Sequence, residues 1–216
     1  MTTSEIINEK RVDLLTVFKQ LNRKWPLILV AVMLSANVFA QVQNAESRMN
    51  ALGPENSSLL EMVGNWDVTE TVWNSPTAPP VTNVKYVAER RMIGSILQEI
   101  MYDKGGSPLK DVERIDYLSF NRVEGRWKYV SMDARVPVGL MPAASFARGE
   151  KGKITIEFEP FSLPGTGIEV SGQMLRMDET ITTLNADHII KEQHFIFADG
   201  KAIPFLAHRY EYIRRK

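Results

Sequence analysis

The sequence predicts an all-β protein, built as a single antiparallel up-and-down barrel of about eight to ten strands. Short runs that alternate apolar and polar residues recur from residue 66 to the end of the chain. Turn residues such as Asn, Gly and Pro separate these runs. No stretch with helical spacing lies between them, which argues against a parallel sheet built from strand–helix–strand units. Consecutive hairpins that close on themselves would leave no exposed sheet edge.

The first strand is predicted at Trp66–Trp73, directly after Gly64 and Asn65. Its apolar residues alternate with polar ones, which is typical of a half-buried strand. We expect Trp66 to plug one end of the barrel.

A short helix is predicted just before this strand. Asn56 or Ser57 is suited to cap it, and Leu59, Leu60 and Val63 would form its apolar side. Such a helix would cover one end of the barrel.

The remaining strands follow in order, each bounded by turn residues. They are predicted at residues 81–92, 95–103, 112–120, 126–133, 154–158, 168–179, 188–197 and 203–214. Asp199-Gly200 is a strong signal for the last hairpin. The segment Asp133–Arg148 fits least well, because Pro137 and Pro142 interrupt it. It is predicted to be an edge strand or a loop folded over a barrel mouth, and not a central strand.

The apolar run Trp25–Ala40 indicates export. It contains no charged residue, follows several cations and ends in Val38-Phe39-Ala40, so Gln41 would be the first mature residue. We therefore expect a cleaved signal peptide over 1–40 and a secreted or periplasmic protein. Two alternatives stay open: an uncleaved inner-membrane anchor that contacts the membrane through residues 25–40, and a buried helix of a cytosolic protein. Residues 41–58 would be a linker and the start of the short helix, and 59–216 the barrel.

The composition narrows the function classes. The 216 residues include 26 Lys+Arg and 26 Asp+Glu, so no general attraction to nucleic acid is expected. The chain has no cysteine, which excludes a disulfide framework, a thiolate metal site and a cysteine nucleophile. No serine-nucleophile or phosphate-loop motif is present. We predict no cofactor and expect a role other than catalysis.

Several motifs together resemble a known family. They are Gly64-Asn65-Trp66, the stretch from Arg90 to Glu99, the stretch from Tyr117 to Val130, and the closing Tyr210–Lys216. They are similar to an uncharacterised family of small exported bacterial proteins, over about residues 59–216. That resemblance implies a calycin-like barrel and transfers no catalytic residue. A weaker similarity is to nitrobindin-type haem barrels, although Asp67, Thr69 and Thr71 stand here in place of their glycines.

A candidate ligand site follows from strand parity, since residues two apart on a strand share a face. If Trp66 points inward, so does Glu70, and if Tyr86 points inward, so does Arg90. These four residues would form a polar floor that orients a small apolar ligand. The alternative is that Glu70 and Arg90 form an internal ion pair.

A second candidate site lies near the C-terminus. Glu192 and His194 share a strand face, and one register of the last hairpin places His208 across from Glu192. These are the ligand types of a two-His-one-carboxylate metal site. Three functions therefore stay open: a binder of a small apolar ligand or envelope accessory protein, a metal- or haem-dependent enzyme, and a filled barrel that acts through protein contacts alone.

Overall fold

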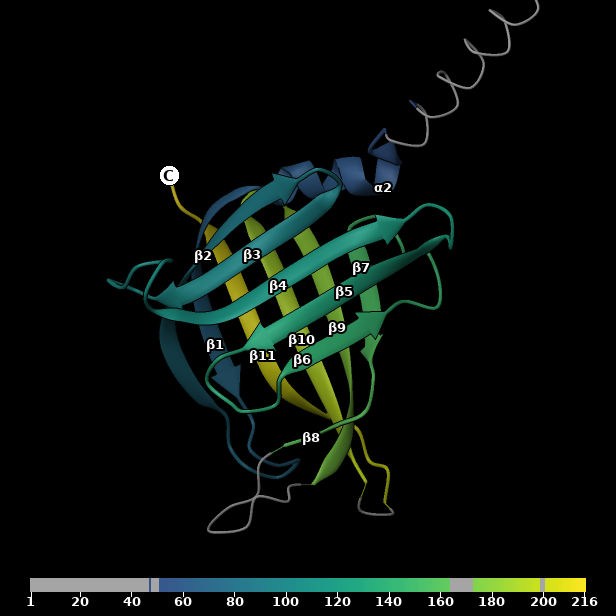
Figure 1. Ribbon diagram of the computed structural model, residues 1–216. Helices are drawn as coiled ribbons and strands as arrows, with labels where there is room; N and C mark the ends of the chain where they lie inside the picture. The colour runs from purple at the N-terminus through teal and green to yellow at the C-terminus, as the bar shows by residue number, and fades with distance from the viewer. Residues whose placement is uncertain (1–46, 48–50, 164–172, 199–200) are drawn as a thin grey trace, which may run out of the picture. The chain divides into compact units, whose positions relative to one another are not determined.

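The computed structural model describes residue 47 and residues 51–163, 173–198 and 201–216. Within the compact unit Leu52–Lys216 the described residues form the predicted all-β barrel, with a short helix over one end (Figure 1). Among the described residues, no helix is long and apolar enough to span a membrane. The predicted export segment, 1–40, lies outside them.

Ten antiparallel strands close the barrel in the part of the chain that the structure describes. In chain order they are β1 Gly64–Val72, β2 Val81–Ile93, β3 Ile96–Asp103, β4 Val112–Asn121, β5 Arg126–Asp133, β6 Leu140–Ala144, β7 Lys153–Phe158, β9 Met174–Asn185, β10 His188–Phe197 and β11 Phe205–Arg214. Each pairs with its neighbour, and β11 pairs with β1 to complete the circle. The two-residue β8, Phe161–Ser162, pairs with β9.

Strand parity sets which side chains fill the barrel. In β1 the side chains of Trp66, Val68 and Glu70 are buried, whereas the residues between them are partly exposed. In β10, Ile189 and Lys191 are buried in the same alternating way. Successive side chains of a strand point to opposite faces, so each strand supplies one inward row. That row includes charged residues as well as apolar ones.

The helix begins earlier than predicted, and the capping prediction is wrong. Helix α2 spans Gly53–Ser58, and its N-cap, Leu52, makes no side-chain capping bond. Asn56 lies inside the helix and is 2% exposed. Its amide oxygen accepts from the backbone N–H of Phe120 at 2.7 Å, and its amide nitrogen donates to the Phe120 carbonyl at 3.0 Å. Asn56 therefore fastens the helix to β4.

A 3-10 turn, η1 Leu59–Met62, continues from α2 into the barrel. Leu59 and Met62 are buried in the core, as an inward apolar side requires, whereas Leu60 points outward and is 51% exposed. The indole nitrogen of Trp66 donates to the carbonyl of Met62 at 2.9 Å. Trp66 is fully buried, so it plugs the helix-covered end.

The segment Asp133–Arg148 is partly the predicted loop and partly a strand of the barrel wall, not an edge strand. Residues 134–139 connect β5 to β6 at the end of the barrel opposite the helix, which we call the open end. β6 is then one of the strands of the barrel wall. The prediction that prolines keep this segment out of the middle of the sheet is wrong. β6 pairs with β7 only through Ala143 and Ala144, so the missing N–H of Pro142 breaks little of the ladder.

The predicted strand 168–179 lies partly outside the described residues, because 164–172 are not described. The observed β9 begins at Met174 and runs to Asn185. The turn residues Asp199-Gly200 also lie outside the described part of the chain. β10 and β11 nevertheless pair antiparallel, as predicted.

Candidate ligand-binding site

Arg135 lies at the centre of a polar cluster at the open end of the barrel. It belongs to the connection between β5 and β6 and reaches residues far away in the chain. Nε and Nη2 donate to the two oxygens of Asp133 at 2.9 and 2.7 Å. Nη1 donates to Glu70 at 3.0 Å and to the hydroxyl of Tyr86 at 3.1 Å, and Nη2 donates to Tyr210 at 3.3 Å. All five N–H groups of the guanidinium are thus engaged.

Glu70, on β1, accepts hydrogen bonds from other residues of this cluster. Burial alone would raise the pKa of Glu70, but a hydrogen bond from His208, the charge of Arg135 and a hydrogen bond from Tyr210 lower that pKa to about 2. The pKa of Arg135 is raised; burial opposes this, but the hydrogen bond to Asp133 and the charges around it prevail. Glu70 and Arg135 are therefore both ionised over the ordinary pH range.

His208, from β11, contacts the other oxygen of Glu70. Its Nδ1 lies 3.0 Å from Oε1 of Glu70. The imidazole ring is parallel to the ring of Tyr210, with centroids 6.0 Å apart, and lies 5.5 Å from the ring of Phe195. These two rings hold the imidazole in one orientation. The side chain is 24% exposed, so it borders open space.

This cluster forms one side of a cavity of about 300 Å³ inside the open end. The rest of the lining is mainly apolar. It consists of Val72, Val136, Val138, Met141, Phe161, Leu163, Met177 and Phe195, together with the polar Arg114, Ser131 and Gln193. Ligand pockets begin at about this volume and commonly combine an apolar wall with a few fixed polar groups.

A layer of buried charges closes the cavity toward the middle of the barrel. Lys191 lies 2.8 Å from Asp116 and 3.5 Å from Glu99. Arg114 lies 3.0 Å from Asp116, and Arg90 lies 2.5 Å from Glu99. All five side chains are at most 5% exposed.

The charges in this layer hold one another ionised, with one exception. Burial would raise the pKa of Asp116, but Arg114 and Lys191 lower it well below its usual range. Glu179 lies 3.9 Å from Lys191, and there burial prevails and raises the pKa of the carboxyl. A buried charge is tolerated only when it is paired in this way.

The four residues predicted from parity separate into two places. Glu70 and Tyr86 line the open-end cavity. Trp66 and Arg90 lie near the helix-covered end, where the guanidinium of Arg90 is 5.3 Å from the Trp66 ring. Glu70 and Arg90 both point inward as predicted, but they do not pair: Glu70 binds Arg135, and Arg90 binds Glu99. The two lie at opposite ends because the register places Arg90 beside Gly64.

The alternative metal set is not brought together. His208 pairs in register with Gln193, one residue away from the expected Glu192. His208 therefore faces inward, whereas Glu192 contacts Arg209 and His194 contacts Asp178 on the partly exposed outer face. Across the described residues, no three His, Asp or Glu side chains are grouped as a metal site requires.

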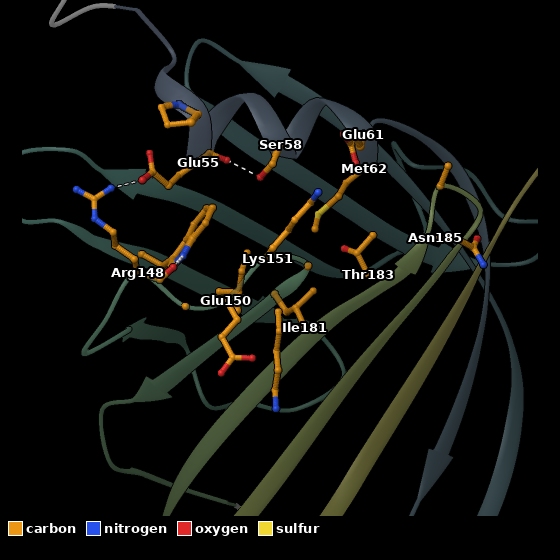
Figure 2. Close-up of a pocket in the computed structure, with 17 residues that line it drawn as sticks. Glu55, Ser58, Glu61, Met62, Arg148, Glu150, Lys151, Ile181, Thr183 and Asn185 are labelled. Atoms are coloured by element: carbon orange, nitrogen blue, oxygen red, sulfur yellow. Dashed lines mark hydrogen bonds and ion pairs between the residues drawn. The ribbon is translucent and has the colours of Figure 1, made fainter.

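A second hollow, of about 650 Å³, lies under the helix (Figure 2). Figure 2 shows α2 above it, with the Glu55–Arg148 ion pair at one side. Its lining includes the buried Met62, Trp127, Ile154 and Ile181. Its cations, such as Arg148 at 63% exposure, extend into solvent. The polar groups of the open-end cavity are instead at least partly buried and held by hydrogen bonds to one another, so that cavity is the stronger candidate.

Sequence reasoning missed Arg135 and the inward role of His208. It also missed the buried charges of β3, β4, β9 and β10. The sequence did contain a signal that Lys191 points into the barrel, because Lys191 shares a strand face with the apolar Ile189 and Phe195. Arg135 had no such signal, since it lies in an irregular connection.

Comparison with known proteins assigns this chain to no family. No family model matches the chain, and no curated protein matches it. Among solved structures, one described as EF1p2_mFAP2b bound to DFHBI covers 74% of this chain and 99% of its own, at 10% identity and a TM-score of 0.28. A likeness at that level carries no argument about function.

Proposed function

We propose that this protein binds a small, largely apolar molecule in the open-end cavity. The observation that carries the proposal is the cavity itself: about 300 Å³, apolar on one side, with an immobilised polar cluster on the other. The guanidinium of Arg135 is held by four side chains before any ligand arrives. A site that is already ordered loses less conformational entropy when it binds.

The cavity favours this function over a barrel filled by its own side chains. The middle of the barrel contains the charge layer, but the open end is hollow. Apolar side chains such as Phe161, Leu163 and Met177 line the hollow and would be buried further by an apolar ligand.

The test is titration with 2-methoxynaphthalene, a small apolar probe, followed by calorimetry and amide NMR. We expect saturable binding of one molecule per chain, with shifts at the cavity-lining residues. Val138→Trp should abolish binding by filling the cavity, whereas Val123→Trp, at a turn residue that is 81% exposed, should leave it intact. Absence of binding, or shifts confined to the hollow under the helix, would refute the proposal.

We also propose that residues 1–40 direct export and that the chain belongs to the exported family it resembles. The uncharged run Trp25–Ala40 and the motif Gly64-Asn65-Trp66 support these two proposals. N-terminal sequencing of protein from cell fractions should find Gln41 first. Leu29→Arg, inside the apolar run, should block export, and Leu14→Arg, outside it, should not. Recovery of Met1 on the wild-type exported fraction would contradict cleavage.

A further inference from the structure

The contact between Glu70 and His208 fixes the tautomer of the imidazole. Nδ1 of His208 lies 3.0 Å from Oε1 of Glu70. A carboxylate with a pKa of about 2 carries no proton to donate at neutral pH. The hydrogen of this bond must therefore belong to Nδ1. In a neutral imidazole, Nε2 is then left with a lone pair and no hydrogen.

Nε2 is an acceptor without a partner in the described part of the chain. The rest of the cluster is saturated. Arg135 uses its five donors, and Tyr210 lies between Arg135 and Glu70. His208 lines the cavity, and its ring is held by Tyr210 and Phe195. His208 thus presents an immobilised, unused hydrogen-bond acceptor to the cavity.

We infer that the ligand is a hydroxyl-bearing aromatic or alicyclic molecule whose O–H donates to Nε2 of His208. This inference rests on the proposed function and adds the chemical class of the ligand. A hydroxyl supplies the missing donor, and the ring body faces Phe161, Phe195 and Met177.

Charged ligands fit this cavity less well. A carboxylate would lie near Glu70 and Asp133, and Arg135 has no donor left to offer. Arg114 also lines the cavity, but it is buried and paired with Asp116 at 3.0 Å. An ammonium group would lose its hydration against an apolar wall, and Glu70 and Asp133 already accept hydrogen bonds from Arg135. A neutral hydroxyl is the group that satisfies Nε2 without bringing an unpaired charge inside.

The test compares two probes that differ at a single group, 2-naphthol and 2-methoxynaphthalene. Wild-type protein should bind 2-naphthol about tenfold more tightly, as one additional hydrogen bond warrants. His208→Phe keeps a ring but removes the acceptor, so the preference should disappear while 2-methoxynaphthalene still binds. His194→Phe, on the outer face, should keep the wild-type preference.

A second measurement does not depend on any variant. The ¹⁵N shifts of the His208 ring should show a protonated Nδ1 and an unprotonated Nε2 in the free protein, and 2-naphthol should move the Nε2 signal. An Nε2–H tautomer, or equal affinities for the two probes, would overturn the inference and leave the proposed function standing. Failure of both probes to bind would instead refute the proposed function.

Discussion

Lys191 and Asp116 form an ion pair inside the barrel, with 2.8 Å between Nζ and Oδ2, although 75 positions separate them in the chain. Their side chains are 2% and 4% exposed. Neither charge is solvated by bulk water, so each depends on the other and on Arg114 and Glu99. The middle of the barrel is therefore a layer of mutually paired charges, and removing a single one leaves its partner less well paired.

Lys191→Met should destabilise the protein by about 3–5 kcal/mol, because it removes the closest cation from the buried Asp116. The double variant Lys191→Met/Asp116→Asn removes both members of the ion pair and should be more stable than Lys191→Met alone. Urea unfolding of both single variants and the double variant measures this coupling. Arg209→Met, which breaks the exposed contact with Glu192, should change stability by at most about 0.5 kcal/mol. A double variant less stable than Lys191→Met would contradict this dependence of Asp116 on Lys191.

Glu70 should make the stability of the protein depend on pH in the acid range. The pKa of Glu70 is lowered from 4.5 to about 2, so the folded state binds this proton less readily than the unfolded state. Its stabilising contribution, of the order of 3 kcal/mol, is complete above pH 4.5 and is lost as the pH falls through about 2. The stability gap between wild type and Glu70→Gln should therefore narrow across this window. A gap that stays constant from pH 5 to pH 2 would rule this out.

A side chain at Gly64 would collide with the guanidinium of Arg214. Its φ is +129°, and an added Cβ would lie 2.8 Å from Nη1 of Arg214. That guanidinium also donates to the carbonyl of Val63 and covers the ring of Trp66 at 4.2 Å. Gly64→Ala should thus cost about 1–3 kcal/mol and disturb the plug at the helix end. Gly94→Ala, at φ +60° with no atom within 4 Å of its Cβ, is the matched control and should cost less. Equal thermal destabilisation of the two variants would exclude the contact with Arg214 as the cause.

Asn56→Ala should loosen the helix from the barrel. It removes both hydrogen bonds to the Phe120 backbone and leaves a buried N–H and C=O unpaired, which costs about 1–3 kcal/mol. Hydrogen exchange should speed up at the amide of Phe120. Ser57→Ala, at the exposed neighbour, should change neither stability nor exchange. Unchanged protection of Phe120 in Asn56→Ala would show that the helix is held by its apolar contacts alone.

The barrel could be predicted from the sequence because its signals are local. Alternation along β1 and β10 gives the inward rows, and Asn121–Gly125 marks a tight hairpin between β4 and β5. The inward direction of Glu70 and Arg90 follows from the same parity and is confirmed. These features depend only on residues a few positions apart.

What the sequence by itself determined, then, is the fold class, the inward rows and the lack of cysteine chemistry. The partners of the inward charges were decided by tertiary structure alone. Strand register places Arg90 beside Glu99 and far from Glu70, and a bulge after Gln193 shifts the pairing of β10 with β11 near His208. Arg135 joins Glu70 from an irregular connection 65 positions away. Parity tells which side of the wall a residue occupies, but a partner across the interior depends on shear, register and loop path, which no short stretch of sequence encodes.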